Sequence, residues 1–452
     1  MSLCFFIVVI MGAVKGSARS SLIAMNEAIS FLVFIILDIV DFMLCYTYKV
    51  IDFLIEAEWK PCYCSFTKEA ITSSGSILVG ESKIVCLTCS SKVHLEEISD
   101  TLYSRPSKWK RRKFDNAGVR STFTVNNSTI VEGKMGAHNI TTPRWSDCDC
   151  NTCNSCKDSL FVRVDGAKAN FEEDVLFLHG FISSSAFWTE TLFPNFSKAA
   201  TSKYRLFAVD LLGFGRSPKP SDSLYTIREH LEMIEKSVIE GHKVKSFHIV
   251  AHSLGCILAL ALAVKYPGSV KSLTLIAPPY FPTPKGEQPT QHMMRRIAPR
   301  RVWPPIAFGA SIACGYEHIS RSVCLVICKN HRLWEFLTKL VTRNRIRTYL
   351  IEGFCCHTHN AAWHTLHNII CGTAGKIEGY LEMVKNKLKC EVTVFHGEDD
   401  ELIPVECSFN VQSRIPRAHV KVIQKKDHIT IVVGRQKSFA TELEQIWNNA
   451  KL

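Results

Sequence analysis

The sequence predicts an α/β fold with a mostly parallel central sheet. Strand-like apolar runs alternate with helix-like stretches over residues 158–280 and again over 386–452, which is the pattern of such a sheet. A turn of small residues at 251–255 also joins one strand-like run directly to a helix-like one. With 452 residues, 46% of them apolar, the chain is longer than one typical domain and has ample material for a large core.

The turn is the pentapeptide Ala251-His252-Ser253-Leu254-Gly255, which lies between the apolar run 247–250 and the helix-like stretch 256–265. A strand, a sharp turn and a helix in this order form a nucleophile elbow. The strained turn needs small residues at 251 and 255, where its backbone packs closely, and it projects the Ser253 hydroxyl outward. Because such pentapeptides also arise by chance, the surrounding chain decides whether Ser253 is a nucleophile.

Upstream, the strand-like run 175–178 leads directly into His179-Gly180-Phe181. In a hydrolase of this fold that loop supplies one amide of the oxyanion hole, and the residue after the nucleophile supplies the other. We therefore expect the backbone amides of Phe181 and Leu254 to be the two donors. Another strand-like run, 206–210, precedes a Gly-containing turn, so the pieces occur in the order that the fold requires.

A serine nucleophile needs a base, and the base needs a carboxylate to orient it. The strand-like run 391–395 ends in His396-Gly397-Glu398-Asp399-Asp400. Asp400 is the expected acid, because it lies three residues past Gly397, where the loop can direct a carboxylate at the site. Asp399 is the alternative.

The last strand-like run, 420–423, is followed by Lys425-Lys426-Asp427-His428, and His428 is the expected base. Ser253, Asp400 and His428 thus follow one another at the ends of successive strands, which is the chain order of this hydrolase fold. Asp427 occupies a position where Gly is common, and it places a second carboxylate beside the base.

Between the two halves of the predicted hydrolase core, 158–280 and 386–452, residues 281–385 form an insertion that we expect to be a helical cap over the pocket. It opens with a Pro-rich segment and contains helix-like runs such as 331–345. The cap carries 14 Lys and Arg against 6 Asp and Glu, which accounts for most of the chain's net charge of +12. These excess basic residues either form a solvated basic face or attract anionic head groups or an anionic membrane surface.

Four cap residues, His357, His364, His367 and Cys371, fall near one helical face and raise the question of a metal site. We expect them instead to pack or to line the pocket. The predicted chemistry requires no metal and no cofactor.

Residues 1–58 form an apolar segment that we interpret as a signal or membrane-associated region. The run 3–14 is short for a membrane span, and 28–56 carries polar residues that return to one helical face. This pattern favours an amphipathic helix at a membrane surface, with a helix packed on the hydrolase domain as the alternative. Cys45 lies on the polar side and is a candidate for lipidation.

Residues 59–157 form a Cys-rich extension. Its closely spaced cysteines admit zinc, disulfides or unpaired thiols, and the sequence alone does not choose among them. Asn-x-Ser/Thr sequons favour an oxidising, extracellular compartment. The basic run 105–113 is interpreted as an exposed loop, and nothing predicts a nucleic-acid partner. The cysteines are Cys62, Cys64, Cys86, Cys89, Cys148, Cys150, Cys153 and Cys156, and the sequons begin at Asn126, Asn127, Asn139 and Asn195.

Residues 58–64, Trp145-Ser146-Asp147-Cys148 and the motifs around His179, Ser253, Asp400 and His428 together resemble the plant BODYGUARD family of α/β-hydrolases. The resemblance spans nearly the whole chain, and the Cys-containing N-terminal segments are its most specific part. It implies an epidermal, extracellular hydrolase involved in cuticle formation, described as a probable lysophospholipase or a cutin-related acyl hydrolase or transferase.

The sequence therefore predicts an α/β-hydrolase fold with a helical cap and an N-terminal membrane-associated, Cys-rich extension. The expected function is a serine hydrolase of lipid acyl esters, either lysophospholipid or cutin-type hydroxy fatty acid esters, secreted to the cell wall or the outer face of the plasma membrane. Water as acceptor gives hydrolysis, and a hydroxy fatty acid gives acyl transfer. A ligand receptor of low turnover and a structural wall protein are the alternatives. The oligomeric state is left open.

Overall fold

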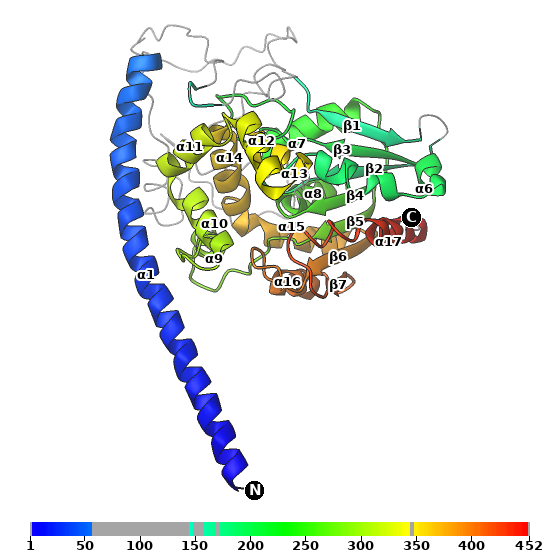
Figure 1. Cartoon of the computed structure of the whole chain (residues 1–452). Coiled ribbons are helices and arrows are strands. Elements are labelled where there is room, and N and C mark those ends of the chain that lie inside the picture. The colour runs from blue at the N-terminus through cyan, green and yellow to red at the C-terminus, as the bar shows by residue number, and fades with distance from the viewer. Residues whose placement is uncertain (1, 57–143, 148–157, 168–170, 344–347, 451–452) are drawn as a thin grey trace, which may run out of the picture.

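The computed structural model of the chain describes residues 2–56, 144–147, 158–167, 171–343 and 348–450 (Figure 1). The eight cysteines of the N-terminal extension, the basic run 105–113 and the sequons at Asn126, Asn127 and Asn139 lie outside the described residues. The fourth sequon is described: Asn195 is exposed, and its side-chain amide donates a hydrogen bond to the Thr191 carbonyl at 2.6 Å.

The described chain contains a seven-stranded sheet with the order β1-β3-β2-β4-β5-β6-β7. β1 pairs antiparallel with β3, and every other neighbouring pair is parallel, which confirms the mostly parallel sheet. The strands are β1 (Val162–Gly166), β2 (Glu173–Leu178), β3 (Tyr204–Val209), β4 (Phe247–His252), β5 (Val270–Ile276), β6 (Glu391–Gly397) and β7 (His419–Ile423).

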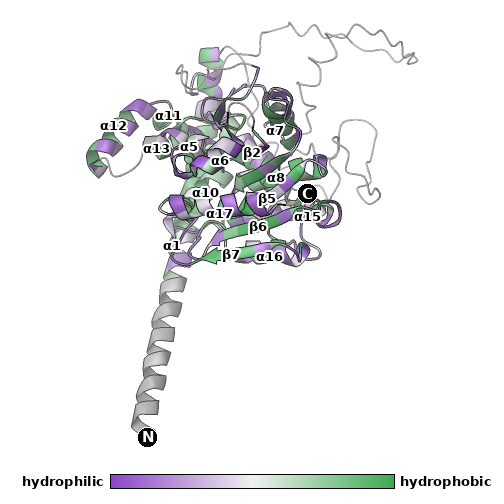
Figure 2. Ribbon diagram, turned by 90° about the vertical axis from the view of Figure 1, so that its right-hand side faces the viewer, coloured by the Kyte–Doolittle hydropathy of each residue, from purple (hydrophilic) through white to green (hydrophobic). Residues whose placement is uncertain are grey.

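Both faces of the sheet are covered by helices, so the inner strands β2 to β6 are largely buried on both sides, whereas the edge strands β1 and β7 are more exposed (Figure 2). Along β2, Leu176 and Leu178 pack into one core cluster, whereas Val175 and Phe177 pack into the other, as the alternation of side chains along a strand requires. The first cluster includes residues of α7 (Ile227–Ile234), α8 (Leu254–Lys265), α15 (Ala374–Lys387) and α16 (Glu406–Arg414). The second includes residues of α5 (Ala186–Thr189), α6 (Lys198–Lys203) and α17 (Gln436–Asn449).

The segment between β5 and β6 is helical, as expected of a cap. Its helices before α15 are α9 (Pro289–Ile297), α10 (Pro305–Gly315), α11 (Glu317–Val326), α12 (His331–Thr342), α13 (Thr348–Cys355), α14 (His359–Thr365) and the short η4 (Leu366–Cys371). They lie beyond the carboxyl ends of the strands, which is where ligands bind in parallel α/β sheets (Figure 1).

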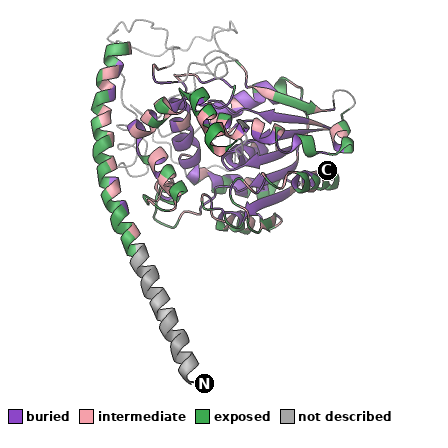
Figure 3. Ribbon diagram, viewed as in Figure 1, coloured by how far each residue is buried: buried purple, intermediate pink, exposed green. Residues whose placement is uncertain are grey.

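The N-terminal segment is a single helix, α1 (Ser2–Glu56), rather than two separate apolar runs. Its residues Ala24–Glu56 are long and apolar enough to cross a membrane, by length and composition. The part of α1 from Ala24 to Glu56 lies along the cap and is exposed over most of its surface (Figures 1 and 3).

The polar side of α1 contacts the cap, and its apolar side faces outward. Arg321 of α11 makes a two-pronged ion pair with Asp52, and Arg300 pairs with Asp38. Two of the basic residues of the cap are therefore neutralised by α1. The exposed apolar residues of α1 include Phe31, Leu32, Ile35, Ile36, Ile39, Phe42, Met43, Val50, Phe53 and Leu54.

Trp145 and Ser146, two residues of the segment that carries the family resemblance, lie where α1 meets the cap. The Trp145 indole N–H donates to Asp52 at 2.7 Å, and Ser146 Oγ accepts from Arg321 at 2.9 Å. The end of α1 is thereby built into a buried polar cluster that also includes α11.

Candidate active site

Ser253 lies between β4 and α8 with φ 52° and ψ −120°, a conformation that is strained for a residue with a side chain. Its amide donates to the Ile276 carbonyl at 2.8 Å, which fixes the turn. Gly255 is needed because a Cβ there would lie 2.7 Å from the carbonyl oxygens of Leu178 and His179. The local backbone is therefore that of a tightly packed nucleophile elbow.

Asp400 and His428 are joined by a short hydrogen bond. His428 Nδ1 donates to Asp400 Oδ2 at 2.7 Å, and both side chains are buried. Asp400 Oδ1 also accepts the amides of Leu402 at 3.0 Å and Ile403 at 2.8 Å. With Nδ1 acting as donor to a carboxylate, Nε2 of His428 is the nitrogen left to accept a proton.

The environment of Asp400 favours its charged form. Burial alone would raise the pKa of Asp400, but hydrogen bonds from His396 and His428 outweigh it and hold that pKa well below its usual range. Asp399, the alternative acid, is exposed, and the hydrogen bond to His428 comes from Asp400.

Asp427 does not compete for the imidazole of His428. Its Oδ1 accepts the amides of Ile429 at 2.9 Å and Thr430 at 2.8 Å. The carboxylate thus caps the turn that carries His428, which explains how an Asp is accommodated where Gly is common.

Two further histidines support this arrangement, and sequence reasoning assigned neither of them a role. His252 Nε2 donates to the His428 carbonyl at 2.9 Å, and its ring stacks on Phe187. Burial lowers the pKa of His252 to about 3, so it is neutral. His396 Nε2 lies 3.5 Å from Asp400 Oδ2 and 2.7 Å from the Ile403 carbonyl. The available signal was position in the sequence, since His252 directly precedes the nucleophile and His396 is the penultimate residue of β6.

The loop after β2 lies directly against Ser253. A Cβ on Gly180 would be 3.2 Å from the Ser253 Cβ, so only Gly allows this approach without displacing its neighbours. His179 holds the loop: its Nδ1–H donates to the Gly180 carbonyl at 2.7 Å, while its Nε2 accepts the Leu211 amide at 2.9 Å. Phe181 follows in this loop.

The two predicted oxyanion donors, the amides of Phe181 and Leu254, directly follow the two residues in this contact, Gly180 and Ser253. Leu254 is the first residue of α8, and the first amides of a helix have no partner within the helix. Among the described backbone hydrogen bonds, none is donated by the Phe181 amide.

Ser253 and His428 line the same cavity, which has a volume of about 650 Å³. No hydrogen bond joins their side chains in the described part of the chain. The cavity walls are mainly apolar and come largely from the cap, including Ile297, Ala313, Leu350, Trp363, Leu366 and Ile370. Among the described residues that line it, none is Lys, Arg, Asp or Glu. The volume and the apolar lining are those of a ligand-binding pocket.

The four cap residues considered for a metal site do not converge. The ring nitrogens of His367 lie 2.8 Å from the Trp363 carbonyl and 3.0 Å from the Cys314 carbonyl. Cys371 is fully buried, which raises the pKa of its thiol to about 12. His357 lies instead next to Cys324 and Cys328, which belong to another segment of the cap. His364 is buried within α14.

Comparison with known proteins gives a family model and several curated relatives. Residues 175–303 match the model described as alpha/beta hydrolase fold. Over 97% of this chain and 99% of the relative, the sequence is 57% identical to "Probable lysophospholipase BODYGUARD 3" of Arabidopsis thaliana. It is 57% identical to BODYGUARD 1, over 96% of this chain and 98% of that protein, and 55% identical to BODYGUARD 2, over 94% and 98%, both from the same plant.

These alignments cover the N-terminal helix, the extension, the cap and the core alike. Nearly complete coverage at more than half identity, together with the parallel sheet and the hydrolase model, leads to one assignment: the chain belongs to the BODYGUARD family of α/β-hydrolases.

Proposed function

We propose that this protein is a serine hydrolase that acts on lipid acyl esters. Ser253 is the nucleophile, His428 the base, and Asp400 the carboxylate that orients His428. The observation that carries the proposal is the buried 2.7 Å hydrogen bond between Asp400 and His428, placed in the same cavity as the strained Ser253. The relatives' name, probable lysophospholipase, supports the same reaction class.

In the proposed reaction, the Ser253 hydroxyl attacks the ester carbonyl while His428 Nε2 takes the hydroxyl proton. The negative charge that develops on the carbonyl oxygen is stabilised by the amides of Phe181 and Leu254. His428 then returns its proton to the leaving alcohol, and an acyl ester on Ser253 remains. The Ser253–His428 hydrogen bond forms when substrate fills the cavity, as catalytic hydrogen bonds commonly tighten on binding.

The cavity favours the acyl chain over the polar head of the substrate. Its lining is apolar and, among described residues, lacks Lys, Arg, Asp and Glu, so a charged head group has no partner inside. The head group of a lysophospholipid, or the next unit of a cutin-type hydroxy fatty acid ester, stays near the mouth. Transfer of the acyl group to water gives hydrolysis, and transfer to a hydroxy fatty acid gives chain extension.

The helix α1 is the proposed contact with a membrane surface. Asp38, Asp41 and Asp52 of α1 contact the cap, and many large apolar side chains of the helix are exposed on its outward side. Ile306 and Val323, which line the cavity yet are exposed, belong to α10 and α11 on the side of the cap next to α1. We propose that a lipid enters the cavity from the membrane past these two residues.

The proposed location is the outer face of the plasma membrane or the cell wall, with a role in cuticle formation. The exposed sequon at Asn195 is compatible with an extracellular location, because a glycan there would extend into solvent.

Labelling with a fluorophosphonate probe tests the proposed nucleophile. Full-length protein in detergent is compared with Ser253→Ala, His428→Ala and the control Ser320→Ala, whose side chain lines the same cavity. We expect labelling of the wild type and of the control, and none of the first two variants. Folded wild-type protein that is not labelled would support the receptor or structural alternatives instead.

A further inference from the structure

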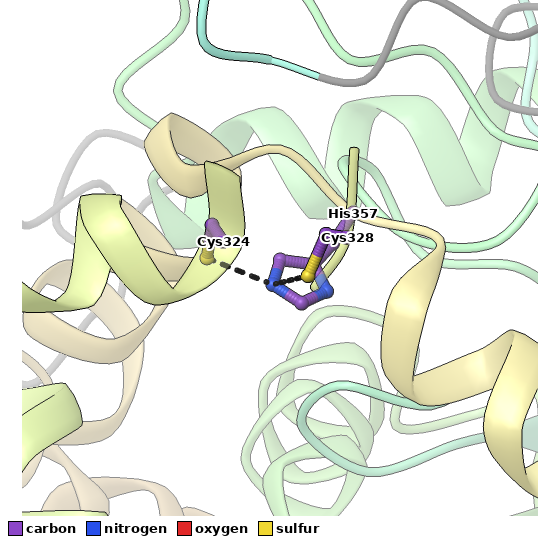
Figure 4. Close-up of side chains that lie close together, drawn as sticks. All are labelled: Cys324, Cys328 and His357. Atoms are coloured by element: carbon purple, nitrogen blue, oxygen red, sulfur yellow. Dashed lines mark hydrogen bonds between the residues drawn. The ribbon is translucent and has the colours of Figure 1, made fainter. Parts of the chain in front are cut away.

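Two cysteines and a histidine from separate parts of the cap meet at the cavity wall (Figure 4). Cys324 belongs to α11, Cys328 follows its end, and His357 lies between α13 and α14. His357 Nε2 is 3.5 Å from Cys324 Sγ and 3.7 Å from Cys328 Sγ, and the three atoms lie within 4.8 Å of one another. Neither cysteine is in a disulfide.

These separations match the edges of a tetrahedral zinc site. Zn–S bonds of about 2.3 Å and Zn–N bonds of about 2.1 Å at tetrahedral angles place sulfur and nitrogen about 3.6 Å apart. The two observed sulfur–nitrogen distances fall on either side of that value. A small displacement of the three side chains would suffice to receive an ion.

A fourth ligand is close by. His359, two residues after His357, lines the same cavity. Its Nε2 is buried without a hydrogen-bond partner among the described residues, which is costly for a polar atom. We propose that Cys324, Cys328 and His357 bind one zinc ion, and that the His359 ring moves to supply the fourth ligand.

The donor set determines the metal class. Two thiolates and two imidazoles are soft to borderline ligands that suit Zn²⁺ and not Mg²⁺ or Ca²⁺. The spacing of three residues between the cysteines lies within the range found in structural zinc sites. Binding releases the two thiol protons to solvent, and neither sulfur is oxidised.

The site joins the cap to the core. The His357 backbone pairs with Phe214 in an isolated β-bridge, and the Phe214 ring packs edge-to-face on Phe181 at 5.9 Å. Zinc held by α11 and the segment 357–359 therefore fixes the cap over the loop that carries Phe181. The metal site does not depend on the proposed catalysis, because its ligands include none of the three proposed catalytic residues.

Zinc content is the first test. Full-length protein is purified in detergent without chelators, and zinc per chain is measured by inductively coupled plasma mass spectrometry. Because the N-terminal cysteines can hold metal as well, the readout is a difference: the double variant C324S/C328S loses one zinc ion relative to the wild type. The matched control Cys314→Ser, a buried cysteine that lines the same cavity, loses none.

A second test needs no variant and so does not depend on the folding of one. Native protein is alkylated with and without a zinc chelator, and modified peptides are mapped by mass spectrometry. Chelator should expose Cys324 and Cys328 to alkylation while leaving the buried Cys314 unchanged. A Cys324–Cys328 disulfide in the mapped peptides, or equal zinc content in the wild type and a folded double variant, would overturn the proposal.

Discussion

Removing Arg321 should release α1 from the cap, because the Arg321–Asp52 pair is almost inaccessible to solvent. Its nitrogen–oxygen distances are 2.7 and 2.6 Å, and the side chains are 3% and 8% exposed. Arg321→Met leaves the Asp52 carboxylate buried with Trp145 as its remaining side-chain donor among the described hydrogen bonds. Removing one partner of a buried ion pair costs about 3–5 kcal/mol.

A matched control is an exposed ion pair made by another acidic residue of α1. The Arg300–Asp38 pair has a separation of 2.8 Å, but its side chains are 57% and 51% exposed. Arg300→Met should therefore cost no more than about 1 kcal/mol, as for other exposed ion pairs.

Amide hydrogen exchange measures the opening of α1 directly. At about 1.4 kcal/mol for each tenfold change, Arg321→Met should accelerate exchange in the last turns of α1 by roughly two to three and a half orders of magnitude, and Arg300→Met by less than about tenfold. Equal acceleration of exchange by the two variants would show that burial does not determine the strength of the contact.

Three further predictions concern the proposed site and the core. Asp400→Asn should lower kcat for ester hydrolysis by about 10⁴-fold without unfolding the protein, whereas Asp399→Asn should change it little. Gly255→Ala should lower the thermal midpoint by forcing a Cβ 2.7 Å from backbone carbonyls, whereas Gly268→Ala, whose Cβ meets nothing within 4 Å, should not. The pKa of Glu173 is lowered to about 2, first by its hydrogen bond with His248, so its contribution to the free energy of unfolding is complete above pH 4.5 and lost as the pH falls toward 2. Glu173→Gln should flatten that loss in urea unfolding measured across this range, and an unchanged slope would contradict the assignment.

The sheet was predictable because its signals are local. β2, β3, β4, β6 and β7 contain the strand-like runs recognised in the sequence, and the parallel arrangement brings the loops after β2, β4, β6 and β7 to one edge. The choice of Asp400 over Asp399 also rested on loop position, and the structure gives Asp400 the hydrogen bond to His428.

Contacts between distant segments were not predictable. The periodicity of 28–56 revealed a polar face on α1 but not that Arg300 and Arg321 cover it, because these partners lie more than 260 residues away. His357 was grouped with residues of its own helical region, whereas in the structure it meets Cys324 and Cys328. Helical spacing describes one segment at a time and cannot show which segments meet.

We propose that Ser253 carries out acyl transfer from a lipid ester. The most direct measurement incubates full-length protein in detergent with a long-chain lysophosphatidylcholine, follows fatty acid release, and maps acylated peptides after rapid quenching. We predict fatty acid release with a transient acyl group on the Ser253 peptide, and loss of both in Ser253→Ala. Unchanged release by the folded Ser253→Ala variant, or an acyl group on another residue, would show that Ser253 is not the nucleophile.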